Sequence, residues 1–310
     1  MLRNILIRRP IGLLLLALMI FCTQATPALG ASPARPKTIV VTYSILGAIV
    51  RELVGNQATV PVPMPNGQDP HDWEPSAKDI ATINKATLIV QNGLGLEGGM
   101  EKTLAQARKA GVKFFTASDH IKVRRVGPGE GIPSGDPDQA VGAKDPHLWM
   151  DPTMMRTVAL ALASRLQADL GLDVSARAQA LAGRLARLDE ETRQTVAQVP
   201  EANRRLVTGH ESMGYFAQRY GFKLVGAIIP SLTSQAQVSA AELAKLKHLI
   251  EQNQVKAIFT ELGTSPAVAD AIGRETGVRV VELTTHSLPA DGSYFTFLHD
   301  LATVITTALK

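Results

Sequence analysis

Residues 37–55 read KTIVVTYSILGAIVRELVG, a run of β-branched residues followed at once by an amphipathic helical pattern. The same order recurs along the chain. TLIVQN (87–92) precedes MEKTLAQARKAG (100–111), and VKAIFTE (255–261) precedes PAVADAIGRETG (266–277). Strands that alternate with helices in this way predict parallel sheets with crossover helices, and therefore an α/β fold.

The remaining elements divide into two groups around two long helical stretches, 153–171 and 174–199. The second stretch is about 26 residues, or roughly 39 Å as a helix, which is long for a crossover connection. We therefore expect two α/β lobes bridged by one long helix. Further strands are predicted at 58–64, 113–118, 204–209, 222–228 and 278–283, and further helices at 77–86, 211–221, 241–253 and from Ser293.

The first thirty residues have the pattern of a secretory signal. A basic start precedes an apolar run, IGLLLLALMIF (11–21), and the small-residue stretch ATPALGAS (25–32). Cleavage after Gly30 is predicted. The only cysteine, Cys22, follows Phe21, so the small residue that precedes a lipoprotein cysteine is absent. We expect an extracytoplasmic protein without a lipid anchor.

Composition excludes several classes of protein. With 45% hydrophobic and 19% charged residues, the chain can bury enough apolar surface to fold. Its net charge of +4 includes three arginines in 1–30, where there is no acid, so the remainder carries about +1. No nucleic-acid partner is therefore expected.

The predicted organisation is a signal peptide 1–30, an N-terminal lobe 31–172, a linking helix 173–200 and a C-terminal lobe 201–310.

A chain without cysteine after Gly30 must hold any metal through nitrogen and oxygen. The string Asp-Pro-His-x-Trp occurs twice, with His71 and His147, each in a predicted loop. His210 ends the predicted strand 204–209, next to a glycine. All three lie in loops or at the carboxyl ends of strands, where open α/β sheets bind ligands. The alternative for each is a surface-loop or capping histidine.

A fourth ligand has more than one candidate. Asp291 comes directly before the last helix, where Ser293 could provide the cap and leave the carboxylate free. Glu261, at the end of a predicted strand, is the competing carboxylate, and water is a further alternative. His286 lies near a predicted strand end and could approach a site. His248 and His299 are expected on the surface, and His120 opens a loop.

Four segments resemble the zinc- and manganese-specific solute-binding proteins of ABC-type metal importers. They are DPHDWEPSAKDI (69–80), DPHLWMDP (145–152), HESMGYFAQRYG (210–221) and DGSYFTFLHDL (291–301). The resemblance extends over the whole chain after the signal. It implies two (β/α)4-like lobes with parallel sheets, joined by a rigid backbone helix, with one metal in the cleft between the lobes.

Carried over to this sequence, the metal ligands of the resembled family fall on His71, His147, His210 and Asp291. The resemblance also implies a periplasmic protein that delivers its metal to an ABC transporter permease, with a zinc metallochaperone as a candidate second partner. We expect a monomer. One departure concerns the loop 124–146, predicted to be mobile: many zinc members have a run of histidines there, and this chain has none.

Three hypotheses for function remain distinct. The first, which we favour, is high-affinity capture of Zn²⁺ for uptake, since His210 stands where manganese members of the resembled family tend to place a carboxylate. Manganese or another divalent metal is the alternative cargo. Copper is the main rival to zinc. The second is a secreted metallohydrolase with Glu211 as base, but the motif HExxH is absent because Gly214 stands four residues after His210. The third is a binding protein for a metal chelate or organic ligand.

Overall fold

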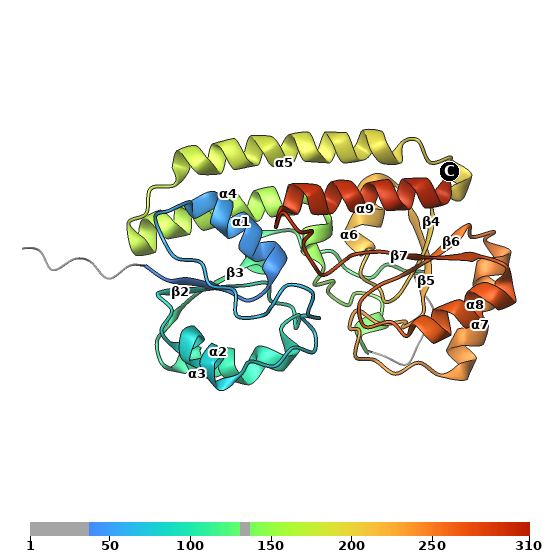
Figure 1. The fold of residues 1–310 in the computed structure, drawn as a ribbon, viewed down its shortest axis with the longest axis horizontal. Coiled ribbons are helices and arrows are strands. Elements are labelled where there is room, and N and C mark those ends of the chain that lie inside the picture. The colour runs from blue at the N-terminus through green and yellow to red at the C-terminus, as the bar shows by residue number, and fades with distance from the viewer. Residues whose placement is uncertain (1–36, 131–136) are drawn as a thin grey trace, which may run out of the picture. The chain divides into compact units, whose positions relative to one another are not determined.

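The computed structural model describes residues 37–130 and 137–310, all of which belong to one compact unit. The predicted signal peptide, 1–30, lies outside the described residues. Within the described part, no helix is long and apolar enough to cross a membrane. The α/β fold with two parallel sheets, one in each of two lobes, is confirmed (Figure 1).

The sheet of the N-terminal lobe has three parallel strands in the order β1-β2-β3. All three residues of β1 are buried, as a β-branched strand in a sheet covered on both faces requires. The strands are β1 (Ile39–Val41), β2 (Leu88–Gln91) and β3 (Lys113–Thr116). The helices are α1 (Ser44–Val54), α2 (Ala77–Asn84) and α3 (Glu101–Lys109).

The strand predicted at 58–64 does not form. This segment runs beside β1, and the backbone of Ile39 and Val41 donates hydrogen bonds to Thr59 and Pro61. Within this segment only Thr59 forms a bridge, with Thr38. Pro61 and the residue two further on, also proline, have no N–H to donate, so the ladder cannot continue.

The sheet of the C-terminal lobe has four parallel strands in the order β5-β4-β6-β7. The first strand of this lobe in sequence, β4, thus lies inside the sheet between β5 and β6. The strands are β4 (Arg205–Thr208), β5 (Lys223–Ala227), β6 (Ala257–Thr260) and β7 (Arg279–Glu282). The helices are α6 (Gly214–Tyr220), α7 (Ala240–Gln252), α8 (Pro266–Thr276) and α9 (Tyr294–Leu309).

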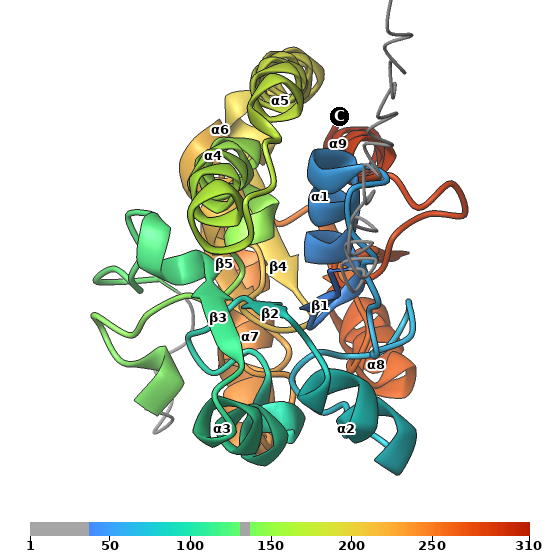
Figure 2. The same cartoon turned by 90° about the vertical axis from the view of Figure 1, so that its left-hand side faces the viewer.

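Two long helices connect the sheets, α4 (Pro152–Leu170) and α5 (Ser175–Val196). Helix α5 runs along the top of both lobes in Figure 1 and packs on α4, α9 and α1. Viewed end-on in Figure 2, α4 lies below α5, with α1 and α9 to one side. At 22 residues α5 is shorter than predicted, because 197–199 form a turn with i→i−3 bonds before Pro200.

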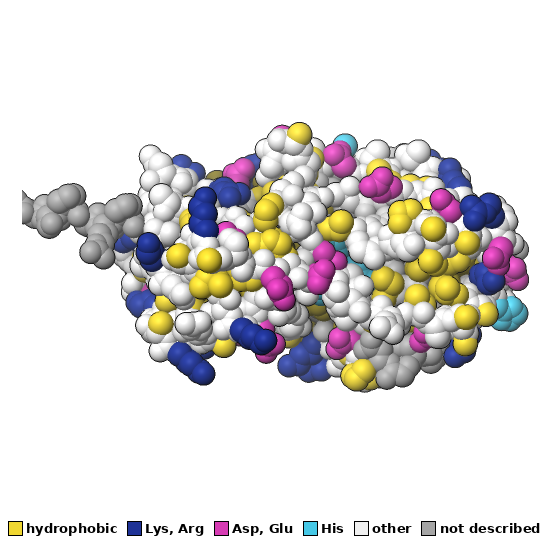
Figure 3. Space-filling model, turned by 60° about the horizontal axis from the view of Figure 1, so that its bottom comes forward, with side chains coloured by type: hydrophobic (Ala, Val, Ile, Leu, Met, Phe, Trp, Pro, Cys, Tyr) yellow, Lys and Arg dark blue, Asp and Glu magenta, His cyan; other side chains and the backbone are white. Residues whose placement is uncertain are grey.

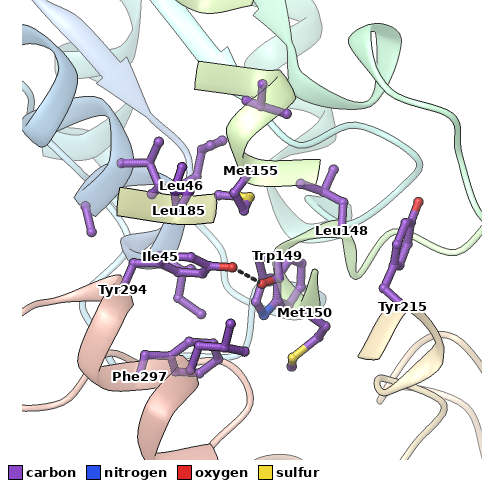
Figure 4. Packing of buried hydrophobic residues seen from close by; sticks show 14 of the residues in the cluster. Ile45, Leu46, Leu148, Trp149, Met150, Met155, Leu185, Tyr215, Tyr294 and Phe297 are labelled. Carbon is purple, nitrogen blue, oxygen red and sulfur yellow. Dashed lines mark hydrogen bonds between the residues drawn. The ribbon is translucent and has the colours of Figure 1, made fainter. Parts of the chain in front are cut away.

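One hydrophobic core extends through both lobes. Trp149 lies at its centre, fully buried, and its Nε1 donates to the backbone carbonyl of Thr285 at 2.9 Å. Tyr294 of α9 donates from its hydroxyl to the carbonyl of Trp149 at 2.7 Å (Figure 4). Leu185 of α5 and Leu46 of α1 belong to the same cluster. The lobes are therefore packed against each other through side chains and not merely tethered.

The loop predicted at 124–146 has paired ends. Arg125 and Lys144 form an antiparallel bridge, and the N–H of Val126 donates to the carbonyl of Ala143 at 2.9 Å. Arg124 also pairs with Glu130 and Asp145. The tip of the loop, 131–136, lies outside the described residues.

Candidate metal centre

Four imidazoles converge where the two lobes meet: those of His71, His147, His210 and His286. Each offers a ring nitrogen, and these nitrogens all lie within 4.8 Å of one another. His71 is 7% exposed and the other three are at most 2% exposed. In Figure 3, a small area of histidine surface shows near the middle of the face, beside acidic side chains. The cluster is therefore almost closed to solvent.

His71 and His147 are presented by the two Asp-Pro-His turns. In each turn the aspartate accepts a hydrogen bond from the backbone N–H of the histidine, at 3.0 Å for Asp69 and 2.9 Å for Asp145. The repeated sequence thus makes a repeated Asx turn. The second turn adds a contact, since Asp145 Oδ1 also lies 2.9 Å from Nδ1 of His147. That contact directs Nε2 of His147 toward the cluster.

His210 follows β4 after a single glycine. A side chain at Gly209 would collide with Thr264 Oγ1 at 2.1 Å and with Glu261 Cγ at 2.6 Å. The glycine therefore allows the close approach that the sequence predicts. Glu261 Oε1 accepts from the N–H of His210 at 2.8 Å and lies 3.1 Å from its Nδ1. This carboxylate holds the backbone of His210 by a hydrogen bond, and its negative charge lies beside the ring at ion-pair distance.

Among these four histidines, His286 had the weakest support from sequence motifs. It follows β7, much as His210 follows β4, and parallel strands deliver both residues to the same edge of the sheet. Its Nδ1 lies 2.8 Å from Thr285 Oγ1. Its Nε2 is buried and has no hydrogen-bonding partner within residues 37–130 and 137–310. The position of His286 at a strand end was the available signal.

Asp291, the predicted fourth ligand, is not in the cluster. It is exposed, and its carboxylate accepts from the N–H of Ser293 at 3.0 Å and from Thr296 Oγ1 at 2.6 Å. Ser293 caps α9, and Asp291 supports that cap. An aspartate at the start of a helix can stabilise the helix N-terminus, and this role explains the position of Asp291. Glu261 is close to the cluster but faces Nδ1 atoms, on the side away from the converging nitrogens.

The separations among three of the nitrogens suit a tetrahedral metal. Nε2 of His147 lies 3.3 Å from Nε2 of His71 and 3.1 Å from Nε2 of His210. Around zinc, with metal–nitrogen bonds of about 2.0–2.1 Å, the ligand atoms of a tetrahedron stand about 3.3–3.4 Å apart. If each Nδ1 carries the proton, the lone pairs of the three Nε2 atoms point toward one place. A cation at that place would relieve the repulsion between them.

The electrostatics favour neutral imidazoles at most of the site. Burial, with a smaller effect from neighbouring imidazoles, lowers the pKa of His71, His147 and His286 well below 6.5. Burial also lowers the pKa of His210, but Glu261 outweighs it, and the net pKa is raised. Burial raises the pKa of Glu261, yet His210 and its hydrogen bonds bring it to about 2. Glu261 is therefore an ionised carboxylate behind the ring of His210.

The other histidines lie outside the site. His120, His248 and His299 are exposed. The ring of His120 stacks on Phe115, with 4.4 Å between centroids. Glu211, considered above as a hydrolytic base, is buried beside His210, and burial raises its pKa to about 7.

Comparison with known proteins identifies the family. The model of the zinc-uptake complex component A family, described as periplasmic, matches residues 39–308. The chain belongs to this family. Its members are metal-binding substrate-binding proteins that work with ABC transporter permeases, and they are not enzymes.

Relatives within the zinc-uptake family are named for different metals. The high-affinity zinc uptake system protein ZnuA of Bacillus subtilis is 29% identical, over 80% of this chain and 77% of its own length. The manganese-binding lipoprotein MntA of Halalkalibacterium halodurans is 25% identical, over 82% and 81%. The iron-binding protein YfeA of Yersinia pestis is 27% identical, over 79% and 76%. These values are too similar to assign a metal.

Solved structures of the family share the fold. The periplasmic zinc binding protein TroA from Treponema pallidum superposes with a TM-score of 0.75 at 25% identity, over 88% of this chain and 99% of its own. A crystal structure of ZnuA gives 0.74 at 26%, over 89% and 100%. The two-lobe architecture implied by the resemblance is thereby confirmed.

Proposed function

We propose that this protein captures Zn²⁺ in the periplasm and delivers it to the permease of an ABC transporter. The observation that carries the proposal is the convergence of four histidine nitrogens within 4.8 Å at a buried point between the lobes. The protein would enter the periplasm through the signal at 1–30 and act as a monomer. In this proposal the metal is cargo, and no resident cofactor takes part.

We propose His71, His147, His210 and His286 as the ligands, with His286 in place of Asp291. Four nitrogen ligands without a water position suit a site that holds an ion and does no chemistry on it. A hydrolytic zinc site keeps one position open for water. The closed set therefore supports a binding role over a metallohydrolase.

An all-imidazole set supports zinc over manganese. Manganese is a hard ion that prefers carboxylate, carbonyl and water oxygens, whereas imidazole suits zinc. Two carboxylates at the site, Asp145 and Glu261, contact Nδ1 atoms and so lie behind the rings. Divalent copper ranks above zinc in intrinsic affinity for such a site. We choose zinc because the matching family is described by zinc uptake.

The lobe boundaries remain part of the proposal. We place the N-terminal lobe at 31–172, the linking helix at 173–200 and the C-terminal lobe at 201–310, with α5 inside the linking segment. A zinc metallochaperone remains a predicted second partner. The narrow space around the imidazoles supports a bare ion over a chelate, because His71 alone among the four has measurable exposure above 2%.

Competitive titration tests the metal. Metal-free protein is titrated with Zn²⁺ and with Mn²⁺ against a chromophoric chelator at neutral pH, and the bound metal is counted by elemental analysis. One zinc per chain, held far more tightly than manganese, is expected. Equal affinity for the two ions would overturn the assignment of zinc. The His286→Ala variant should lose affinity steeply while Asp291→Ala does not, and the reverse result would restore Asp291 as the ligand.

A further inference from the structure

Glu261 contacts more of the metal centre than one histidine. Its Oε1 accepts from the N–H of His210 at 2.8 Å, and the hydroxyl of Ser212 lies 2.9 Å from Oε2. The hydroxyl of Thr285 also donates to Oε2. With its side chain 1% exposed, Glu261 is enclosed by groups that donate to it.

The hydroxyl of Thr285 has two neighbours and only one proton. One neighbour is Glu261, which as an ionised carboxylate can only accept. The other is Nδ1 of His286, 2.8 Å away. Because the hydroxyl proton is used on Glu261, the oxygen must act as acceptor toward the imidazole. Nδ1 of His286 therefore carries the proton.

The tautomer of His286 decides whether it can bind a metal. A neutral imidazole protonated on Nδ1 has its lone pair on Nε2, and Nε2 of His286 is buried without a hydrogen-bonding partner among the described residues. The opposite tautomer would place a hydrogen on the nitrogen that faces the other three rings. The hydroxyl of Thr285 is thus the group that makes His286 a ligand before the ion arrives.

We propose that Glu261 and Thr285 are positioning residues that set the tautomers of His210 and His286 together. Glu261 acts on His210 through its negative charge, 3.1 Å from Nδ1, and on His286 through the hydroxyl of Thr285. This rests on the proposed function, since a tautomer matters to binding only if these rings hold the metal. One buried carboxylate then orders both ligands of the C-terminal lobe and supplies negative charge behind a set of neutral ligands.

The size of the change in zinc affinity distinguishes a positioning role from simple packing. Groups that hold metal-binding histidines typically change metal affinity 10–100-fold when they are removed. Valine has nearly the shape of threonine without the hydroxyl, so Thr285→Val removes the acceptor for Nδ1 and leaves the volume filled. Serine keeps the hydroxyl. A matched control is Thr306→Val on α9, since Thr306 is also buried and its hydroxyl contacts the carbonyl of Thr195.

The test combines zinc titration with NMR of the metal-free protein. Thr285→Val should weaken zinc binding roughly 10–100-fold, while Thr285→Ser and Thr306→Val stay within a few-fold of wild type. Thermal unfolding of each metal-free variant checks that it folds. If Thr285→Val binds zinc as wild type does, the positioning role is wrong.

Imidazole ¹⁵N shifts in the metal-free wild type report the tautomer directly. His286 should be protonated on Nδ1, and Thr285→Val should remove that preference. Protonation on Nε2 in the wild type would mean that the hydrogen bonds run in the opposite direction, and would overturn the proposal. This measurement uses no metal, so it stands or falls separately from the zinc assignment.

Discussion

The two lobes hold their histidines in different ways. In the C-terminal lobe, His210 and His286 follow strands β4 and β7 and share Glu261 behind their rings. In the N-terminal lobe, His71 and His147 sit on turns outside the sheet. His147 is fixed by Asp145 and by the buried Trp149, with 5.3 Å between ring centroids. No described side chain accepts a hydrogen bond from Nδ1 of His71.

This difference indicates which of the proposed ligands can move. Three of the imidazoles belong to the packed interior, whereas His71 is held chiefly through its backbone and through contacts across the lobes. Ser234 of the C-terminal lobe donates to Asp69, next to the His71 turn. Asn66 pairs with both the N–H and the carbonyl of Leu288, each at 2.8 Å. We therefore expect the segment around 66–71 to be the part that opens when the ion enters or leaves.

Removing a ligand should have the largest effect. We expect His71→Ala, His147→Ala and His210→Ala each to weaken zinc binding by more than about 100-fold. This loss exceeds the effect of removing a residue that only positions a metal-binding histidine. The lobes should differ in the metal-free state: His210→Ala should also lower the unfolding temperature, because Glu261 loses its buried partner. Titration and thermal unfolding measure both, with exposed His248→Ala as control. An equal loss of metal-free stability in His71→Ala would contradict the comparison.

Acidification should act mainly through His210. Its pKa is raised, so its proton competes with metal at a higher pH than the protons of the other three imidazoles, whose pKa values are lowered. Between pH 7 and 5 affinity should fall by at most about tenfold per pH unit, as one competing proton requires. Competitive titration across this range checks the slope. A fall near a thousandfold per unit would mean that three imidazoles titrate together.

The metal-free protein should lose stability in the same range. The unfolded chain protonates His71, His147 and His286 near pH 6.5, whereas the folded chain does not, so their contribution is present above pH 6.5 and lost as pH falls below it. His210 has the opposite sign: its raised pKa stabilises the fold at low pH, and this contribution is lost as pH rises through the folded pKa. Denaturant midpoints measured from pH 7 to 5 should therefore decline.

Loosening the contact across the lobes should have a moderate effect. Asn66→Ala removes two hydrogen bonds to Leu288, each worth about 1 kcal/mol. Zinc affinity should fall by less than about tenfold, chiefly through faster dissociation, since the ligands themselves remain. Stopped-flow release into a chelator measures the rate. Gln68→Ala on the same segment is the control, and equal rates for the two variants would exclude a role for Asn66 in holding the segment closed.

Asp291→Ala should have the smallest effect. Zinc affinity should not change, because the carboxylate serves Ser293 and Thr296 at the start of α9. The unfolding temperature should fall slightly through loss of support for that helix cap. The same titration and melting experiments decide this, and a steep loss of zinc binding would return Asp291 to the ligand set.

Much of the fold could be predicted from local patterns, because the periods of strands and helices are properties of short segments. The predictions of β2, β3, β4, β5, β6 and β7 are confirmed. The strand at 58–64 failed because its prolines weigh against pairing, a signal that was present in the sequence. The predicted α6 began too early, at Glu211, where His210 and Ser212 instead serve Glu261.

The cluster was harder to predict, since its members are distant in sequence. The Asp-Pro-His repeat marks His71 and His147, and a glycine beside a strand end marks His210. No such neighbour marks His286. Asp291, five residues later in the sequence, has a carboxylate that can also bind zinc. Which of the two turns inward depends on the path of the chain after β7, and spacing alone does not determine that path.

The hydrophobic core that extends from one lobe to the other also limits where the chain could be joined to that of a relative in a hybrid protein. Helix α9 is the last element in sequence, yet it packs on α1 and α5 and places Tyr294 against Trp149. A hybrid that joined the first lobe to the second lobe of a relative would exchange α9 along with it. The foreign helix would then have to fit a surface made by the native α1 and α5. Recombination between members of the family is thus limited by this shared interior, independently of the four histidines.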